Sequence, residues 1–238
     1  MKMENKLTYL VHGRRALFSD PITRVGGEKF SYHIPTYQAI KGITESIYWK
    51  PTIVWRVLRV RVLNKIRMES SGIRPIKYND ATGNELSYYT YLKDVAYEVE
   101  VKFDWNENRP DLIKDRNENK HFFMAKRAIE SGGRRDIFLG TRECQGYIEP
   151  CEFGENESYY DSENTSDEVT YGMQFHSFIY PDEAYDDESY NNFTATFWNA
   201  KMVNGIINFP LPKDTQYKRK IYGMEKKDFI PDKNFSFV

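Results

Sequence analysis

The sequence is poor in cysteine, which excludes a disulfide scaffold or a cysteine-rich zinc fold. Its 238 residues include two cysteines, Cys144 and Cys151, with no CxxC pair and no histidine at a zinc-ligand spacing. We therefore expect two free thiols in a reducing compartment, no metal site and no cofactor. A chain of this length can bury a core without disulfides or metals.

Long apolar runs are also missing. No segment reaches the roughly 18 apolar residues that a membrane-spanning helix requires, because Arg56, Arg59 and Arg61 interrupt the most hydrophobic stretch. The N-terminal MKMENKLTYLVHGRR mixes charges into its one apolar stretch and has no signal-peptide pattern. We expect a cytoplasmic protein with no membrane partner.

The common catalytic motifs are absent as well. The sequence contains no Walker loop, no GxSxG turn and no HExxH helix. Carboxylates are abundant after residue 150, but a two-metal nuclease needs them on rigid elements that converge on one point, and no such pattern occurs. The usual hydrolase classes are therefore not indicated.

The net charge of −1 conceals an uneven distribution. Residues 1–135 contain 25 Lys and Arg against 16 Asp and Glu, a balance of +9. Residues 136–238 contain 9 against 19, a balance of −10. This asymmetry predicts one anion-binding half and one half that faces solvent or partner proteins.

The first 150 residues contain four strand-like and two helical segments. The strands alternate apolar and polar residues, and the helices repeat apolar residues every three or four positions; Thr36 is a suitable cap for the first helix. In chain order the segments are Leu7–Ser19, the helix Tyr37–Tyr48, Ile53–Met68, Tyr88–Asp104, the helix His121–Glu130 and Phe138–Tyr147. The order β-α-β-β-α-β predicts an α+β fold with an N-terminal ferredoxin-like (RRM-like) domain over residues 1–150.

Residues 151–238 predict a smaller antiparallel β-sheet domain that begins with an acidic surface loop over residues 152–168. The strand candidates that follow are Thr170–Tyr180, Phe193–Met202 and Ile206–Phe209. Asn204-Gly205 between the last two predicts a tight hairpin turn. The tail beyond Pro210 is basic at Lys218–Lys220 and ends in Phe235 and Phe237.

Lys120 and His121 stand side by side at the predicted start of the second helix. An imidazole can move a proton near neutral pH, an ammonium group can neutralise phosphoryl charge, and a helix N-terminus favours anions. A solvated charge run with a capping histidine explains the isolated pair better, and Tyr48 alone is typical of a core aromatic. A functional role for the pair is favoured by its context, because a ferredoxin-like unit with a basic strand is a recurrent RNA-binding platform.

Several segments resemble the CRISPR-associated RAMP proteins, and among them the Cas-five family of subtype I-C, the Cas-five-d or Dvulg type. The resemblance extends from Leu7 to about Phe209, and its most specific parts are IYWKP and NKHFFMAKR. The segments that carry it are TESIYWKP, IVWRVLRVRVLN, NENKHFFMAKRAIESGGRRDIFLGTREC and Gly146–Ile148.

The resemblance implies an endoribonuclease that cuts the repeat hairpin of precursor guide RNA (crRNA) without a metal ion. The implied catalytic residues are Tyr48, Lys120 and His121. The RNA's 2′-hydroxyl would attack the adjacent phosphorus and leave a 2′,3′-cyclic phosphate. His121 or Tyr48 would remove the 2′ proton, the other would help the 5′-oxygen leave, and Lys120 would stabilise the phosphorane. A phenol with a pKa of about 10 is a poor base at neutral pH, so the alternative role for Tyr48 is only to orient the nucleophile.

The resemblance also implies partners. The protein would remain on the 5′ handle of the crRNA and join the other Cascade subunits of a type I-C system, an assembly that allows contact with double-stranded DNA. We expect phosphate contacts from the basic strand and the first loop, although an arginine that faces inward would pair internally instead. The candidates are Arg56, Arg59, Arg61, Lys65, Arg67, Arg24, Lys29 and His33.

Three other functions fit the sequence. One is a non-catalytic subunit that holds the guide RNA while another protein cuts it. A second is a DNA nuclease that uses a divalent cation, whose activity a chelator would remove. The third is a β-rich module that uses its aromatics for protein or glycan contacts, whose binding would lack the steep salt dependence of nucleic-acid binding.

Overall fold

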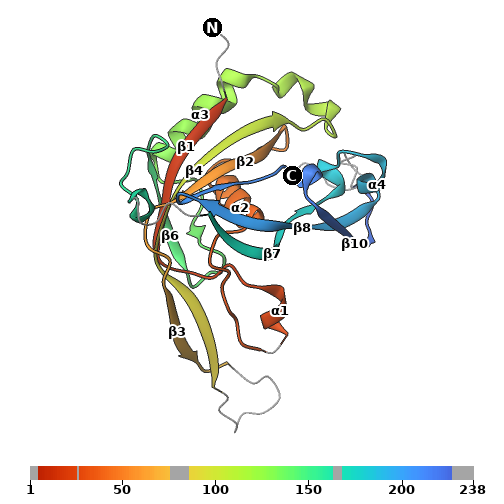
Figure 1. Ribbon diagram of the computed structural model, residues 1–238. Helices are drawn as coiled ribbons and strands as arrows, with labels where there is room; N and C mark the ends of the chain where they lie inside the picture. The colour runs from red at the N-terminus through yellow and green to blue at the C-terminus, as the bar shows by residue number, and fades with distance from the viewer. Residues whose placement is uncertain (1–4, 26, 76–85, 163–167, 227–238) are drawn as a thin grey trace.

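The computed structural model describes residues 5–25, 27–75, 86–162 and 168–226, without the side chains of Ile22 and Arg24. Strands dominate, and the helices are few and short (Figure 1). The elements are β1 (Lys6–Ala16), α1 (Pro21–Arg24), α2 (Tyr37–Ile47), β2 (Ile53–Val62), β3 (Met68–Ile73), β4 (Ser87–Trp105), α3 (Glu118–Glu130), β5 (Ile137–Phe138), β6 (Gln145–Pro150), β7 (Glu168–Ile179), α4 (Asp187–Tyr190), β8 (Asn192–Val203), β9 (Ile206–Asn208) and β10 (Tyr217–Gly223).

The described strands form a 10-stranded, mostly antiparallel sheet. Its order is β10-β8-β9-β2-β4-β1-β6-β5, with β3 also on β4 and β7 also on β8. The predicted combination of helices with antiparallel strands is confirmed. The elements β1, α2, β2, β4, α3 and β6 follow one another in the predicted β-α-β-β-α-β order.

Two predicted strands are each divided in the structure. The segment Ile53–Met68 forms β2 and the start of β3, because β4, with 19 residues, is long enough to pair with both. The segment Phe138–Tyr147 forms the hairpin of β5 and β6. Gly140 permits this bend with a φ of +96°, and a Cβ there would lie 2.1 Å from the carbonyl oxygen of Leu17.

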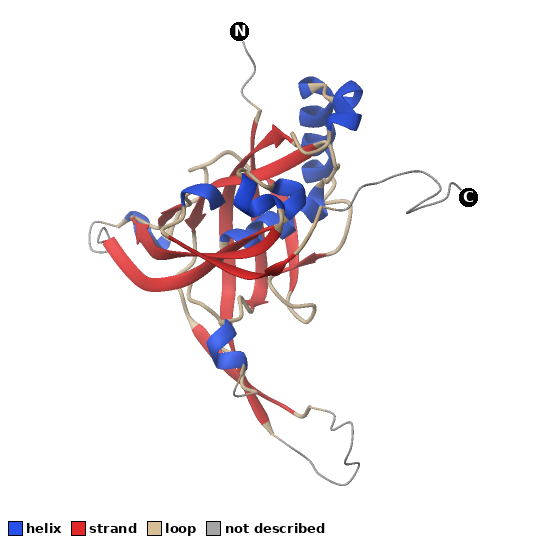
Figure 2. Cartoon of the chain, turned by 90° about the vertical axis from the view of Figure 1, so that its right-hand side faces the viewer, coloured by secondary structure: helices blue, strands red, loops and turns tan. Residues whose placement is uncertain are grey.

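The hairpin of β3 and β4 projects from the body in both ribbon views (Figures 1 and 2). Residues 76–85, which follow β3 and precede β4 in the chain, are outside the described part of the structure.

Helix α2 is buried along one side and anchors the core. Tyr37, Ile40, Ile43 and Ile47 are buried, as the three-and-four spacing predicts. The side chain of Thr36 accepts a hydrogen bond from the backbone N–H of Ala39 at 3.1 Å, which confirms the predicted cap.

The C-terminal strands extend the same sheet, since β9 pairs with β2. Asn204 and Gly205 form the predicted tight turn between β8 and β9, with φ values of 50° and 74°. The strands on both sides of residue 150 thus belong to one sheet. The division into domains at this residue stays a prediction. The basic tail contributes a strand, β10, that the apolar pattern did not predict because all its residues are exposed; Phe235 and Phe237 lie outside the described residues.

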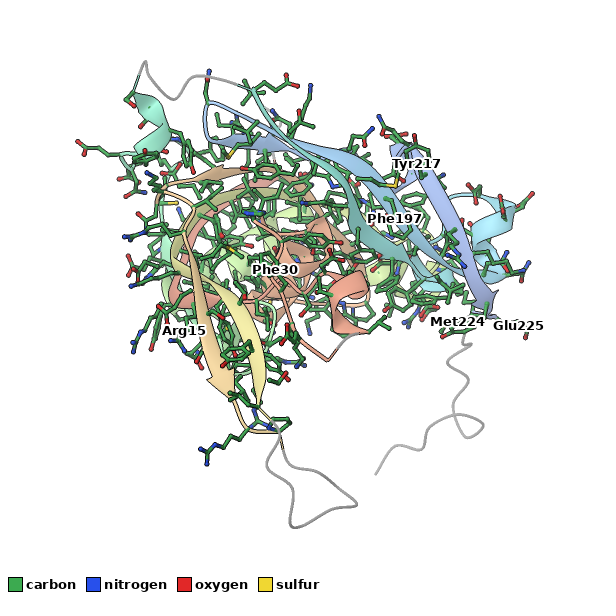
Figure 3. The ribbon with its side chains drawn as sticks, turned by 60° about the horizontal axis from the view of Figure 1, so that its bottom comes forward. Arg15, Phe30, Phe197, Tyr217, Met224 and Glu225 are labelled. Atoms are coloured by element: carbon green, nitrogen blue, oxygen red, sulfur yellow. The ribbon has the colours of Figure 1, made fainter. Side chains whose placement is uncertain are left out.

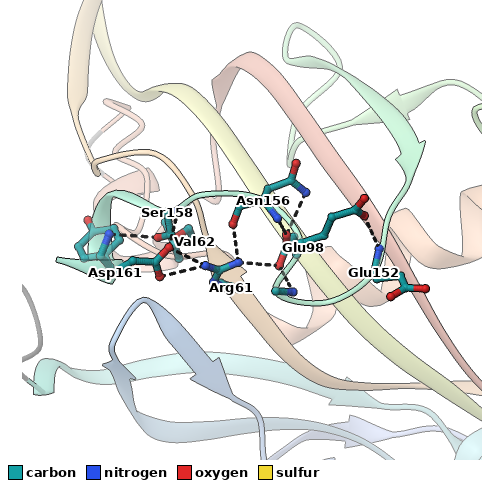
Figure 4. A network of polar contacts seen from close by, with 10 residues as sticks. Arg61, Val62, Glu98, Glu152, Asn156, Ser158 and Asp161 are labelled. Atoms are coloured by element: carbon teal, nitrogen blue, oxygen red, sulfur yellow. Dashed lines mark hydrogen bonds and ion pairs between the residues drawn. The ribbon is translucent and has the colours of Figure 1, made fainter.

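The described part of the acidic loop, residues 152–162, lies across the face of β2 and β4 opposite the core (Figure 4). The buried carboxylate of Glu98 accepts hydrogen bonds from the backbone N–H groups of Gly154, at 2.7 Å, and Asn156, at 2.9 Å. Burial opposes ionisation, but these bonds hold the pKa of Glu98 below its ordinary value. Arg61 bonds to Glu98 at 3.2 Å and to both carboxylate oxygens of Asp161, at 2.9 and 2.8 Å.

Replacing Arg61 by alanine should lower the free energy of unfolding by about 2 kcal/mol, because it leaves the buried Glu98 charge without its cationic partner. Urea unfolding monitored by circular dichroism measures this change. The control is Arg67→Ala, which removes an exposed pair with Asp94 and should cost less than about 0.5 kcal/mol. Equal losses in both variants would contradict a structural role for the Glu98 network.

Candidate active site

The site lies where the C-terminus of α2 meets the N-terminus of α3. Tyr48 directly follows α2, and Trp55 on β2 donates its indole N–H to the Tyr48 carbonyl at 2.7 Å. The side chain of Asn117 caps α3 by accepting the backbone N–H of Lys120 at 3.0 Å. This cap starts the helix three residues earlier than predicted and places Lys120 and His121 in its first turn.

Tyr48 and His121 are hydrogen-bonded to each other. The Tyr48 hydroxyl lies 2.8 Å from His121 Nδ1, and the imidazole ring packs against Trp105 and Phe103 with centroids 5.7 and 6.2 Å apart. His121 Nε2 lies 2.9 Å from the backbone carbonyl oxygen of Asp115. A carbonyl oxygen can only accept, so Nε2 carries a proton and Nδ1 of the neutral ring accepts the Tyr48 hydroxyl proton.

Asp115 connects the members of the site, and sequence reasoning missed it. Its carboxylate accepts hydrogen bonds from Lys120 Nζ and, at 2.6 Å, from Thr52 Oγ1, and it lies 3.4 Å from His121 Nε2. The bonds from Lys120 and Thr52 lower the pKa of Asp115. The signal in the sequence was an acid five positions before Lys120, but only the 3-10 turn Pro110–Asp115 and the Asn117 cap fold it back onto the pair.

The catalytic candidates differ in exposure. The Lys120 side chain is 46% exposed, whereas Tyr48 is 1% and His121 0% exposed. Arg134 is exposed and lies with Cζ 6.0 Å from the centre of the Tyr48 ring. Lys120 is thus open to solvent, whereas Nδ1 of His121 is covered by the Tyr48 hydroxyl.

The environment of Tyr48 keeps its hydroxyl protonated. Burial, followed by the negative charge of Asp115, raises the pKa of Tyr48, and Arg134 opposes this only in part. A phenol with a raised pKa stays protonated at neutral pH, so Tyr48 is not available as a base but keeps a proton that it can donate.

Among the predicted RNA contacts, Arg56, Arg59 and Arg61 on β2 have acidic partners on β4. Arg56 is buried and bonds to Asp104 at 3.1 Å and to the Tyr185 hydroxyl. Arg59 bonds to Glu100 at 2.8 Å, and its guanidinium carbon lies 4.0 Å from the Phe153 ring centre. Arg56 and Arg61 are buried and paired, which favours the alternative that an inward-facing arginine pairs internally instead of binding phosphate. Their contact with RNA stays a prediction.

The other five candidates lie outside β2. Arg67 is exposed and paired with Asp94 at 3.3 Å, and Lys65 Nζ lies 5.1 Å from the Tyr159 ring centre. Lys29 Nζ lies 4.7 Å from the ring centre of Tyr89, and the exposed His33 stacks on Tyr171 at 6.1 Å. The Arg24 side chain is outside the described part of the structure. The structure thus brings the three catalytic candidates together but scatters the RNA-contact candidates.

Cys144 and Cys151 are free thiols, as predicted. Within residues 5–25, 27–75, 86–162 and 168–226, no three His, Cys, Asp or Glu side chains gather where they could hold a metal ion. None of the described helices is long and apolar enough to span a membrane.

Residues 7–210 match the sequence profile of Cas5d, described as CRISPR-associated protein (Cas_Cas5). The chain belongs to the Cas5d family. The resemblance carried by the IYWKP and NKHFFMAKR segments is thereby confirmed, and the matched range includes the whole site of this Cas5d family member, from Tyr48 to Arg134.

Two relatives are both named CRISPR pre-crRNA endoribonuclease Cas5d. The protein from Thermus thermophilus is 32% identical over 155 residues, which are 61% of this chain and 64% of that relative. The chain thus spans less than two thirds of the length of this relative. The protein from Mannheimia succiniciproducens is 27% identical over 232 residues, covering 87% of this chain and 96% of the relative.

Solved structures share the fold of this Cas5d family member. The crystal structure of a CRISPR-associated protein has a TM-score of 0.74 and 35% identity, and covers 91% of this chain and 97% of its own. A functionally uncharacterized protein from Streptococcus mutans has a TM-score of 0.73 and 36% identity over the same shares.

If this site cleaves RNA, Asp115→Asn should slow cleavage on the order of 10²-fold, because an amide no longer holds the Lys120 ammonium or orients His121 as a carboxylate does. Single-turnover cleavage of repeat RNA measures the rate, and thermal unfolding verifies the fold. Asp111→Asn, in the same turn but paired with Arg109, is the matched control and should cut normally. An Asp115→Asn rate equal to that of the control would remove Asp115 from the site.

Proposed function

We propose that this protein is an endoribonuclease that cuts precursor crRNA in the repeat hairpin. The observation that carries the proposal is the 2.8 Å hydrogen bond between the Tyr48 hydroxyl and His121 Nδ1, with Lys120 on the same carboxylate as His121. The names of the two relatives, both pre-crRNA endoribonucleases, support the choice of substrate.

The proposed reaction begins when the Tyr48 side chain moves so that its hydroxyl faces the RNA instead of His121. His121 Nδ1 takes the proton of the 2′-hydroxyl as its oxygen bonds to the adjacent phosphorus. The bond from phosphorus to the 5′-oxygen breaks, and Tyr48 donates its proton to that oxygen. Lys120 neutralises the charge that develops on the phosphoryl oxygens.

The products of this route are a 2′,3′-cyclic phosphate and a free 5′-hydroxyl. The hydrogen bond between His121 and Tyr48 then returns the proton from the imidazolium to the phenolate, which restores the starting state. Acid, base and cation all come from the protein, so we propose that cleavage needs no divalent metal ion.

We propose an assembly role as well. The strand order β2-β4-β1-β6, with α2 after β1 and α3 after β4, supports a ferredoxin-like unit over residues 1–150. Residues 151–238 would be the smaller β-sheet part. In this proposal the protein holds the 5′ handle after the cut and serves as a Cascade subunit of a type I-C system.

The burial of the site favours a second candidate function. Tyr48 and His121 are 1% and 0% exposed, as expected of a subunit that holds guide RNA and leaves cleavage to another protein. The two functions differ in whether RNA binding exposes His121 Nδ1.

The native chain should cut its cognate repeat RNA in excess EDTA, and His121→Ala should lose on the order of 10²-fold or more in rate while binding the RNA normally. Gel analysis of end-labelled RNA measures the cut, and filter binding measures affinity. His12→Ala is the matched control, because this half-exposed histidine pairs with Glu149 away from the site.

Three outcomes separate the readings. Binding without a cut by the native chain would support the guide-holding function. Activity that EDTA removes would indicate a metal-dependent nuclease. Equal cleavage by His121→Ala would remove this histidine from the reaction.

A further inference from the structure

The sheet of β7, β8 and β10 has an aromatic face turned away from the core. On β8, Thr194, Thr196 and Trp198 are buried, and the alternation of a strand points Phe193 and Phe197 to the other side. Cross-strand partners share a face. The resulting aromatic face comprises Phe175, Phe178, Tyr180, Phe193, Phe197, Tyr217 and Tyr222.

The rings form a continuous series across the strands. Phe178 stacks on Phe193 with centroids 4.7 Å apart, and Phe193 contacts Tyr180 at 4.9 Å and Tyr222 at 5.3 Å. Phe175 extends the series, 4.7 Å from Phe178 and 6.1 Å from Phe197. Figure 3 shows Phe197 and Tyr217 on neighbouring strands near the edge of the sheet.

The outer members of the series are open to solvent. Tyr222 is 54%, Tyr217 49% and Tyr180 38% exposed. Aromatic rings exposed in a connected group, rather than singly, mark a binding surface.

The edge strand beside these rings is cationic. Lys218, Arg219 and Lys220 are all exposed on β10. Arg219 is paired with Ala195, between the pairs Tyr217–Phe197 and Tyr222–Phe193, and so projects from the aromatic face. Within the described residues, no ion pair at 4.0 Å or less joins Arg219 to a carboxylate, which leaves its charge available to an anion.

The central part of the sheet offers no comparable surface. The acidic loop covers the outer side of β2 and β4 through Glu98, Asn156 and Arg61, and Phe153 occupies the position over the Arg59 guanidinium. The protein's own chain thus closes the sheet face on which RNA would stack in an RRM-like unit.

We propose that the aromatic face of β7, β8 and β10 binds single-stranded RNA, with bases stacked on the rings and phosphates held by Arg219. Rings beside cations are the usual platform for single strands, and these rings lie beside three exposed cations of β10, Lys218, Arg219 and Lys220. This rests on the proposed function for RNA as the ligand, and it adds a second contact outside the active site for single-stranded RNA that flanks the hairpin.

Fluorescence anisotropy of the full chain with a labelled single-stranded oligouridylate tests the proposal. Tyr222→Ala and Arg219→Ala should each weaken binding about 10-fold, and Arg219→Ala should also reduce the salt dependence by about one unit of slope. Tyr222→Phe keeps the stacking ring and should bind like the native chain. The matched controls are Tyr190→Ala, an exposed tyrosine in the acidic helix α4, and Lys201→Ala, an exposed lysine paired with Glu168.

Unchanged affinity and salt slope in Tyr222→Ala and Arg219→Ala would overturn the proposal. Native-like RNA affinity combined with loss of binding to the purified partner subunits would also overturn it, in favour of a protein-docking face. Cleavage of saturating hairpin RNA is measured in parallel and should be unaffected. A native chain that binds the oligouridylate through this face but fails to cut would contradict the proposed function alone.

Discussion

The pairing of β4 with its neighbours is the constraint on which the rest of the structure depends. This strand pairs with β1 on one side and with β2 and β3 on the other. Its core side ends in Phe103 and Trp105, and both rings pack against the His121 ring. Its opposite side carries Glu98, which fixes the acidic loop. One strand therefore positions the imidazole and closes the outer face of the sheet.

The site combines a buried proton-transfer pair with an exposed cation. Tyr48 and His121 share a hydrogen bond out of solvent, while Lys120 reaches solvent from the same Asp115 carboxylate. Burial preserves the orientation of the pair and keeps the phenol protonated, since it raises the pKa of Tyr48. Lys120 is therefore accessible to solvent, whereas Tyr48 covers Nδ1 of His121.

The helices and strands were easier to predict from the sequence than the side-chain contacts between them. Apolar spacing predicted α2, β4 and β8, and a resemblance supplied Tyr48, Lys120 and His121. Strand alternation placed Arg59 and Arg61 on one side of β2. It cannot show which residues of β4 lie beside them, and in the structure Glu100 and Glu98 pair with these two arginines. Asp115 was missed because its role depends on a 3-10 turn, and β10 because it has no buried residue.

The measurement that tests the central claim most directly uses repeat RNA with a single 2′-deoxy nucleotide at the cut, after the cut has been mapped on all-ribose RNA. If the 2′-hydroxyl is the nucleophile activated by His121, the protein should bind this RNA with native affinity and leave it intact at that site. Cleavage of the 2′-deoxy RNA at the native rate would show that another nucleophile attacks the phosphorus, and it would contradict the account.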